Sequence, residues 1–156
     1  MRVVAVLVVM LAGAARRAVA DPAAVTAAFE HARAPISIAA DGRFAGADAL
    51  RAALANATFV MLGEDHGIAQ IPSIGAALCA EVAPLGFARL ALEVGPSVAP
   101  QLAGFARAKD GAVRTQAFSK QFPETIAFYE WREEQVMLAA CARVVAAQGA
   151  GRQLEL

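Results

Sequence analysis

Residues 58–67 have the sequence Thr-Phe-Val-Met-Leu-Gly-Glu-Asp-His-Gly, an apolar run followed directly by three titratable side chains. The run at 58–62 is short, contains Thr, Phe and Val, and ends at Gly63. This pattern predicts a strand buried on both faces. Ligands bind at the carboxyl ends of strands in open α/β sheets, so residues 64–66 stand where a site is expected. A polar loop whose His and acids face water explains this stretch, taken alone, equally well.

A second apolar run, residues 87–92, ends in Glu93, and a segment with helical periodicity separates it from the first run. The apolar positions of that segment are Ile71, Ile74, Leu78, Val82 and Leu85. Strand, helix and strand in this order predict two parallel strands joined by a right-handed crossover. We therefore expect an α/β fold with a mostly parallel sheet flanked by helices.

The other segments predict helices around such a sheet. Helical patterns run from about residue 22 to 34, 49 to 55, 97 to 109 and 124 to 148, with a loop or broken helix at 113–125. The last four residues, Gln-Leu-Glu-Leu, resemble the opening of a third main strand. Because two strands cannot cover the faces of such layers, we expect residues 21–156 to form one α/β domain that is incomplete at its C-terminus.

Residues 1–20 are predicted to be a secretory signal peptide. Arg2 supplies the positive start, residues 3–15 form an apolar core, and residues 18–20, Ala-Val-Ala, fit the small-residue cleavage rule. A core of this length is too short to cross a bilayer of about 30 Å as a helix. We expect an exported protein, periplasmic or secreted, that begins at Asp21 and keeps no stable membrane anchor. The alternative is an N-terminal anchor or a buried helix in a protein that is not exported.

Charge and cysteine content exclude some classes of function. The formal net charge is zero, so the chain lacks the basic footprint of a nucleic-acid-binding protein. The two cysteines, Cys79 and Cys141, allow one intramolecular pairing, and the sequence leaves open whether they form it. No C-x-x-C motif is present, which argues against a thiol redox centre or a zinc knuckle.

Three residues form the candidate site: Glu64, His66 and Glu93. Glu64 and His66 are two apart, so in an extended segment their side chains point to the same side. Glu93 ends the next predicted strand, and parallel pairing would bring all three groups to one sheet edge. One imidazole and two carboxylates suit a divalent metal that activates water, or a metal-free site in which His66 is a general base.

The sequence resembles a known superfamily at these residues. Residues 62–67, Leu-Gly-Glu-Asp-His-Gly, followed by an amphipathic helix and then Ala-Leu-Glu at 91–93, are similar to motifs of the erythromycin esterase, ChaN and TIKI/TraB superfamily. A weaker similarity covers residues 128–140, where Phe-Tyr-x-Trp-Arg-x-Glu resembles an esterase helix. One residue separates Glu64 from His66 where the esterases have two, and the esterases' C-terminal His has no counterpart.

The resemblance implies a hydrolase that acts on an ester or related acyl bond of a small-molecule substrate. It assigns His66 as the base that activates water and Glu64 and Glu93 as the residues that orient it, with no cofactor favoured. The TIKI type implies instead a divalent metal held by these same residues, and the ChaN type implies a haem-binding exported protein. A non-catalytic fragment is a further alternative.

Other polar residues are weaker candidates. Glu134 shares a helix face with Leu138 and is expected at a solvated rim rather than inside the site. Arg132 and Glu133 are interpreted as solvated charges, and His31 as a surface residue. Tyr129 is a haem ligand if the ChaN interpretation holds, and otherwise a partly buried aromatic side chain.

Overall fold

The computed structural model describes residues 21–32, 35–63 and 66–156, which belong to two compact units. Of these residues, 21–32, 35–37 and 45–63 form the first unit, and 38–44 and 66–156 form the second. The predicted signal peptide, residues 1–20, lies outside the described residues, and so does Glu64.

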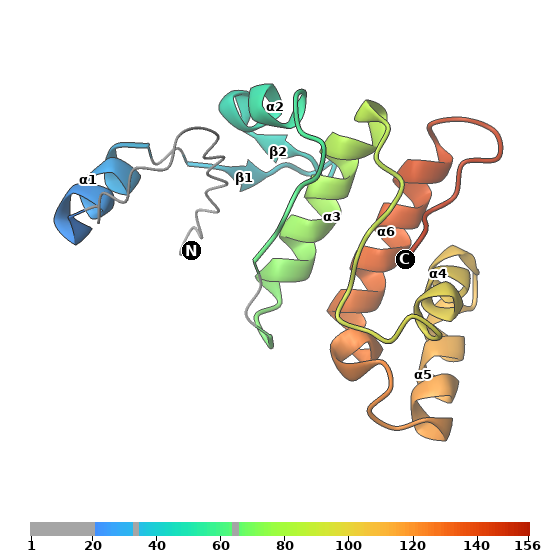
Figure 1. Ribbon diagram of the computed structural model, residues 1–156. Coiled ribbons are helices and arrows are strands. Elements are labelled where there is room, and N and C mark those ends of the chain that lie inside the picture. Colours follow the sequence, from blue (N-terminus) through green and yellow to red (C-terminus); the bar gives the residue numbers. More distant parts are fainter. Residues whose placement is uncertain (1–20, 33–34, 64–65) are drawn as a thin grey trace. The chain divides into compact units, whose positions relative to one another are not determined.

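The predicted fold class, a mostly parallel sheet flanked by helices, is wrong. Helices account for 55% of the described residues and strands for 5%. Within the described part of the chain, the sheet consists of one antiparallel pair, β1 (Ser37–Ile38) and β2 (Phe44–Ala45). Figure 1 labels the two strands of this short hairpin. The protein is therefore mainly α-helical over the residues that the structure describes.

The first predicted strand, residues 58–62, carries no regular secondary structure. Phe59 and Met61 are 61% and 71% exposed, so the run is not buried on both faces. Apolar and β-branched residues favour an extended backbone, but a strand also needs a neighbouring strand to pair its N–H and C=O groups. The composition of residues 58–62 predicted an extended backbone, but it carries no information on whether a neighbouring strand is present.

The second predicted strand is extended but almost unpaired. Alternate side chains of residues 88–94 pack against the core, and those between them face outward. One parallel bridge joins Arg89 to Glu155, where the Leu90 N–H donates to the Glu155 carbonyl and the Glu155 N–H donates to the Ala88 carbonyl, both at 2.9 Å. The predicted third strand is thus reduced to this single bridge.

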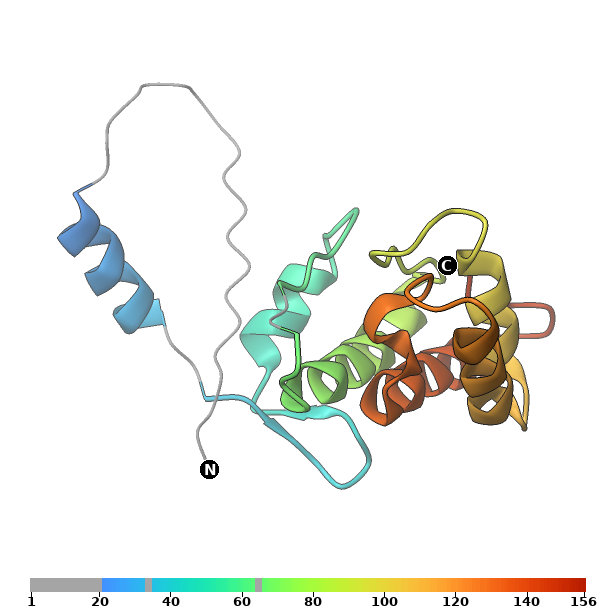
Figure 2. The ribbon, with the colours of Figure 1, turned by 90° about the horizontal axis from the view of Figure 1, so that it is seen from below.

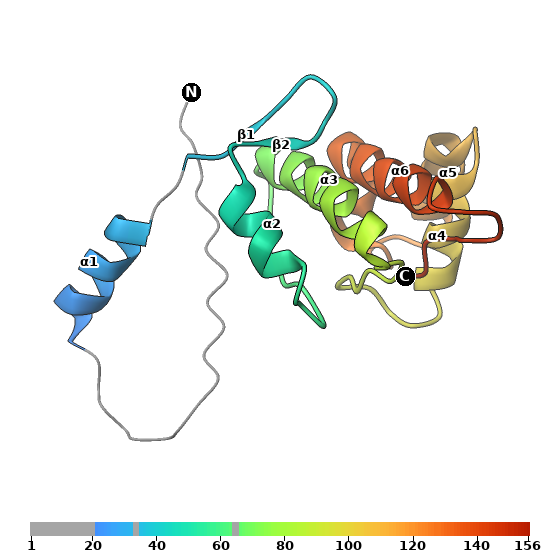
Figure 3. The same ribbon diagram turned by 90° about the horizontal axis from the view of Figure 1, so that it is seen from above.

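Helices build the second unit. They are α3 (Gln70–Val82), α4 (Ala99–Arg107), α5 (Gly111–Gln121) and α6 (Arg132–Ala146), with short 3-10 turns η1 (Ala83–Leu85) and η2 (Ala127–Glu130). Figures 1, 2 and 3 show α3 and α6 side by side, with α4 and α5 packed next to α6. The core contains Leu102, Ile126, Tyr129, Leu138, Cys141 and Val145.

The chain between α5 and α6 differs from the prediction. Residues 113–125 were expected as a loop or broken helix and the last helix was expected to begin near residue 124, but α5 reaches Gln121 and α6 begins at Arg132. Pro123 cannot donate a backbone hydrogen bond, and Glu124 and Ala127 have positive φ values of 65° and 44°. This backbone cannot continue a helix, so the connection turns before α6.

A disulfide joins the two central helices. Cys79 on α3 is bonded to Cys141 on α6, and their Cα atoms are 5.2 Å apart. Cys141 is fully buried. The two helices pack with these positions facing each other, which decides the pairing that the sequence left open.

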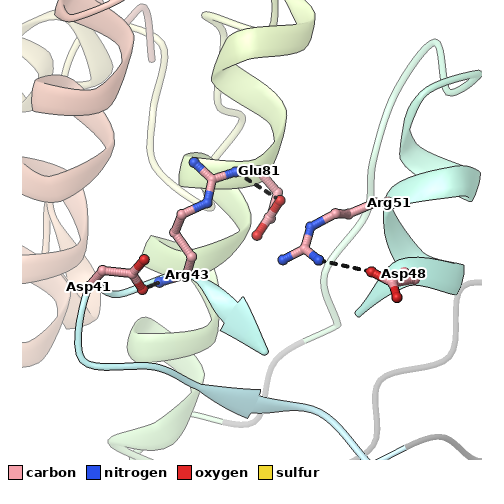
Figure 4. A network of polar contacts seen from close by, with 5 residues as sticks. All are labelled: Asp41, Arg43, Asp48, Arg51 and Glu81. Carbon is pink, nitrogen blue, oxygen red and sulfur yellow. Dashed lines mark hydrogen bonds and ion pairs between the residues drawn. The ribbon is translucent and has the colours of Figure 1, made fainter. Parts of the chain in front are cut away.

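A buried carboxylate fixes the tip of the hairpin on α3 (Figure 4). The hairpin tip is closed by the Ala39 N–H, which donates to the Arg43 carbonyl at 2.8 Å, and Asp41 Oδ1 accepts from the Arg43 N–H at 3.0 Å. The Arg43 guanidinium donates to Glu81 Oε2 at 3.1 Å. The Glu81 side chain is 3% exposed, whereas that of Arg43 is 45% exposed. This charged hydrogen bond partly compensates for the removal of Glu81 from water.

Replacing Arg43 by Met should therefore lower the free energy of unfolding by about 1–2 kcal/mol, since a hydrogen bond to a charged group contributes about 1.5–3 kcal/mol and half-exposure weakens it. Urea unfolding followed by the fluorescence of the single Trp would measure the change. Arg114→Met is the matched control, because Arg114 donates to Asp110 at 2.8 Å on the open surface of α5. An equal loss in both variants would contradict the role given to Glu81 burial.

The first unit contains α1 (Pro22–Ala32) and α2 (Asp48–Leu54). Asp48 lies in the first turn of α2, where it accepts a hydrogen bond from the Arg51 guanidinium at 3.2 Å (Figure 4). Leu54, at the end of α2, is buried. Among the helices of the described residues, none is both long and apolar enough to cross a membrane.

Candidate functional site

His66 lies in the turn that leads into α3. Gly67 follows it with a φ of 85°, a left-handed conformation that side chains with a Cβ rarely adopt. This glycine allows the tight turn at residues 66–67 that precedes α3. The side chain is 34% exposed, which leaves the ring accessible to a small molecule.

Glu93 lies at the end of the extended segment that follows η1. The Val94 N–H donates to the Leu92 carbonyl at 2.9 Å, so the chain turns tightly at Glu93 and directs its side chain away from the core-facing residues. Glu93 Oε2 is 3.7 Å from His66 Nε2, and the carboxylate is 76% exposed. This separation suits an ion pair and exceeds the length of a direct hydrogen bond. Catalytic pairs are often this loose without substrate.

Two aromatic rings extend the site beyond the His66–Glu93 pair. The Phe128 ring on η2 lies against His66, with ring centroids 3.7 Å apart and planes inclined by 35°. Trp131 follows with its centroid 5.2 Å from that of Phe128, and it is 41% exposed. We call Phe128 and Trp131 the aromatic wall. It fixes one face of the imidazole and offers an apolar surface next to a base and an acid.

The structure separates the other candidates from this pair. Tyr129 is 4% exposed and belongs to the hydrophobic core, where it is closed to a ligand such as haem. Glu134 was expected at a solvated rim, and this prediction is wrong because α6 buries it to 8% exposure. His31 is exposed on α1, and Arg132 and Glu133 are exposed at the start of α6.

A metal site was the alternative to a metal-free base at these residues. No group of three His, Cys, Asp or Glu side chains that could hold a metal ion occurs among residues 21–32, 35–63 and 66–156. His66 and Glu93 are two of the predicted ligands, and the third, Glu64, lies outside the described residues. The metal site stays a prediction, and the chemistry below uses the imidazole and the carboxylate.

No protein-family model, curated protein or solved structure matches the chain. The similarity of residues 62–67 to the erythromycin esterase, ChaN and TIKI/TraB superfamily therefore stays a prediction. The inference of function depends on the geometry around His66 and on the chemistry of its neighbours.

Sequence reasoning missed the contact between Phe128 and His66. A signal was present, because Phe128 and Trp131 belong to the Phe-Tyr-x-Trp segment that resembles an esterase helix. The segment was expected to start the last helix, but it forms η2 and the residue before α6. In this turn the Phe128 side chain reaches back to the loop before α3, which no helical periodicity predicts.

Proposed function

We propose that the protein is a hydrolase that acts on an ester or related acyl bond of a small molecule, with His66 as general base. The supporting observation is the 3.7 Å approach of His66 Nε2 to Glu93 Oε2, between residues that are distant in sequence, beside an accessible aromatic wall. An imidazole paired with a carboxylate is a common arrangement for proton transfer to and from water.

The pairing assigns roles to the two side chains. A carboxylate beside the imidazole stabilises the positive charge that the ring takes up when it accepts a proton. In the proposed reaction the imidazole takes a proton from water as the water oxygen attacks the acyl carbon. The imidazolium is stabilised by Glu93, and it returns the proton to the alcohol that leaves when the tetrahedral intermediate collapses.

The other groups have supporting roles in this proposal. Phe128 packs on the imidazole and limits its rotation, which keeps the ring in one orientation. Trp131 provides apolar surface for the part of the substrate that does not react. Glu64 is assigned a supporting role by the superfamily resemblance and lies outside the described residues.

We also infer that the protein is exported. Residues 1–20 have the three parts of a signal peptide, and the disulfide between Cys79 and Cys141 is of a kind that persists in oxidising compartments. The periplasm or the external medium is then the place where it meets its substrate.

The test of the proposed function is hydrolysis of p-nitrophenyl esters with acyl chains of increasing length. His66→Ala should lower kcat/KM by about 100-fold or more, since a general base contributes about 10²–10⁴. Glu93→Gln should lower it less, by about 10-fold, because the base remains and only the stabilisation of its charge is lost. A chelator should leave the rate of the wild-type protein unchanged.

His31→Ala is the matched control, because this exposed histidine on α1 has no place in the proposed site, and its rate should equal that of the wild type. Circular dichroism would verify that His66→Ala remains folded. Equal rates for wild type and His66→Ala would overturn the proposal. So would a haem Soret band that develops on titration of the wild type and is lost in His66→Ala, since that result would place a haem on the same histidine.

A further inference from the structure

A cleft lined by cations opens between α4, α5 and α6 of the second unit. Its volume is about 520 Å³, within the range of small-molecule sites. Phe105, Val136 and Ala139 contribute apolar surface to it. Its cations are Arg107, Lys109, Arg132 and Arg143, and its lining includes no acidic side chain. We call it the cationic cleft.

Three of the four cations are not neutralised by the described part of the chain. The side chains of Lys109, Arg132 and Arg143 form no hydrogen bond or ion pair with any residue that the structure describes. Arg107 is different, because its guanidinium donates to the Leu154 carbonyl at 2.9 Å, which fixes its position at the cleft. Four positive charges thus line one cleft, and no acidic side chain of the described residues forms an ion pair with them.

The acidic residues nearest in sequence have other environments. Asp110 follows Lys109, but it accepts a hydrogen bond from Arg114 at 2.8 Å, and this bond lowers the pKa of the Asp110 carboxyl. Glu133 follows Arg132 and lines a different cleft, which α3 and α6 share with the hairpin tip. Neither acid lines the cationic cleft, so an anion from outside would meet little competition there.

The spacing of the cations along α6 indicates the shape of the ligand. Arg132 and Arg143 are eleven residues apart on this helix, which corresponds to about 16 Å along its axis at 1.5 Å per residue. Val136 and Ala139 lie between them and also line the cleft. A ligand that follows this face of α6 meets a positive charge at either end and apolar surface between the two charges.

We propose that the cationic cleft binds a carboxylate that carries an unbranched apolar chain, a medium-chain fatty acid in its simplest form. The carboxylate is bound by cations at one end of the cleft, and the chain lies on Phe105, Val136 and Ala139. This inference is independent of the proposed hydrolase, since His66 and Glu93 do not line the cleft.

The test uses decanoate below its micelle-forming concentration, with the full chain and isothermal titration calorimetry. Decanol and decyltrimethylammonium have the same chain with a neutral and a cationic head. Decanoate should bind at least ten times more tightly than decanol, decyltrimethylammonium should bind most weakly, and added salt should weaken decanoate binding. Equal binding of decanoate and decanol would overturn the proposal by showing a purely apolar groove. Inorganic phosphate that displaces decanoate at equal concentration would overturn it by showing a small-anion site.

Two triple variants locate the binding. Lys109→Gln, Arg132→Gln and Arg143→Gln together should weaken decanoate binding at least tenfold. Arg89→Gln, Arg114→Gln and Lys120→Gln remove the same charge outside the cleft and should leave it unchanged. Equal weakening in both would overturn the assignment, as would no weakening in the first. Ala139→Trp tests the cleft without changing charge, and this bulkier side chain should block decanoate.

His66→Ala separates this inference from the proposed function. The variant should bind decanoate as the wild type does, whatever its rate of ester hydrolysis. Loss of decanoate binding in His66→Ala would overturn the cationic cleft by placing the carboxylate at the His66 site instead. Failure of the esterase assay, on the other hand, would leave the expected binding to the cleft as it is.

Discussion

Loss of the disulfide between Cys79 and Cys141 should lower the free energy of unfolding by about 4 kcal/mol, because the bond closes a loop of about 60 residues in the unfolded chain. The two cysteines are 62 positions apart and join α3 to α6. These helices pack side by side through the core of the second unit. Without the bond, the unfolded chain has a higher conformational entropy, because the loop is no longer closed, and this stabilises the unfolded state.

The measurement is urea unfolding of the double variant Cys79→Ala, Cys141→Ala, followed by Trp fluorescence and circular dichroism. The midpoint of thermal unfolding should fall by roughly 15 °C for a domain of this size. A thiol reductant supplies the internal control, because it should destabilise the wild type by a similar amount and leave the double variant unchanged. A wild type that is equally stable with and without reductant would contradict the prediction.

Helices were more predictable than the sheet because their hydrogen bonds are local. In α3, Ile71, Ile74 and Leu78 follow the 3.6-residue period, and the helix occupies the predicted stretch. A strand depends on a partner elsewhere in the chain, and residues 58–62 lack the pairing that their composition suggested. The end of α6 was predictable because helical hydrogen bonds are local. Its start was predicted too early, because the turn at η2 precedes it.

The candidate site was predicted from a parallel sheet edge that the described residues do not form. His66 and Glu93 nevertheless lie 3.7 Å apart, because the turn before α3 and the end of the extended segment meet in the second unit. The strand-helix-strand interpretation was wrong about the strands, and α3 is the one element of it that the described part of the chain contains. The predicted roles of both residues await the hydrolysis assay.

Features that several helices form together could not be predicted from the sequence. Arg132 was interpreted as a solvated charge, and by exposure it is one. Its membership of a cleft depends on Phe105 of α4 and on Gly111 of α5, which are brought next to α6 by packing alone. In the same way, the burial of Glu134 follows from the position of α6 among its neighbours. The chemistry of a side chain can be predicted from the sequence, whereas its surroundings are determined by tertiary contacts.

Gly111 is a second position where a small change should have a large effect. A Cβ added there would lie 2.0 Å from the carbonyl oxygen of Phe105, well inside van der Waals contact. That oxygen is backbone, and it accepts the N–H of Ala108 at 3.0 Å, so it cannot move without loss of the bond that ends α4. Gly111→Ala should therefore separate α4 from α5 and destabilise the protein by about 2–3 kcal/mol, as overpacked sites do.

Gly104→Ala is the matched control, since this glycine lies inside α4 and an added Cβ would meet no atom within 4 Å. Here Ala should raise the free energy of unfolding by about 0.5–1 kcal/mol, because Ala favours the helical backbone over Gly by that amount. Urea unfolding of the two variants should thus shift in opposite directions from the wild type. If Gly111→Ala were as stable as Gly104→Ala, the close approach of α5 to the Phe105 carbonyl would be refuted. The cationic cleft, which Gly111 lines, should distort in the first variant, and its decanoate affinity should fall with the stability.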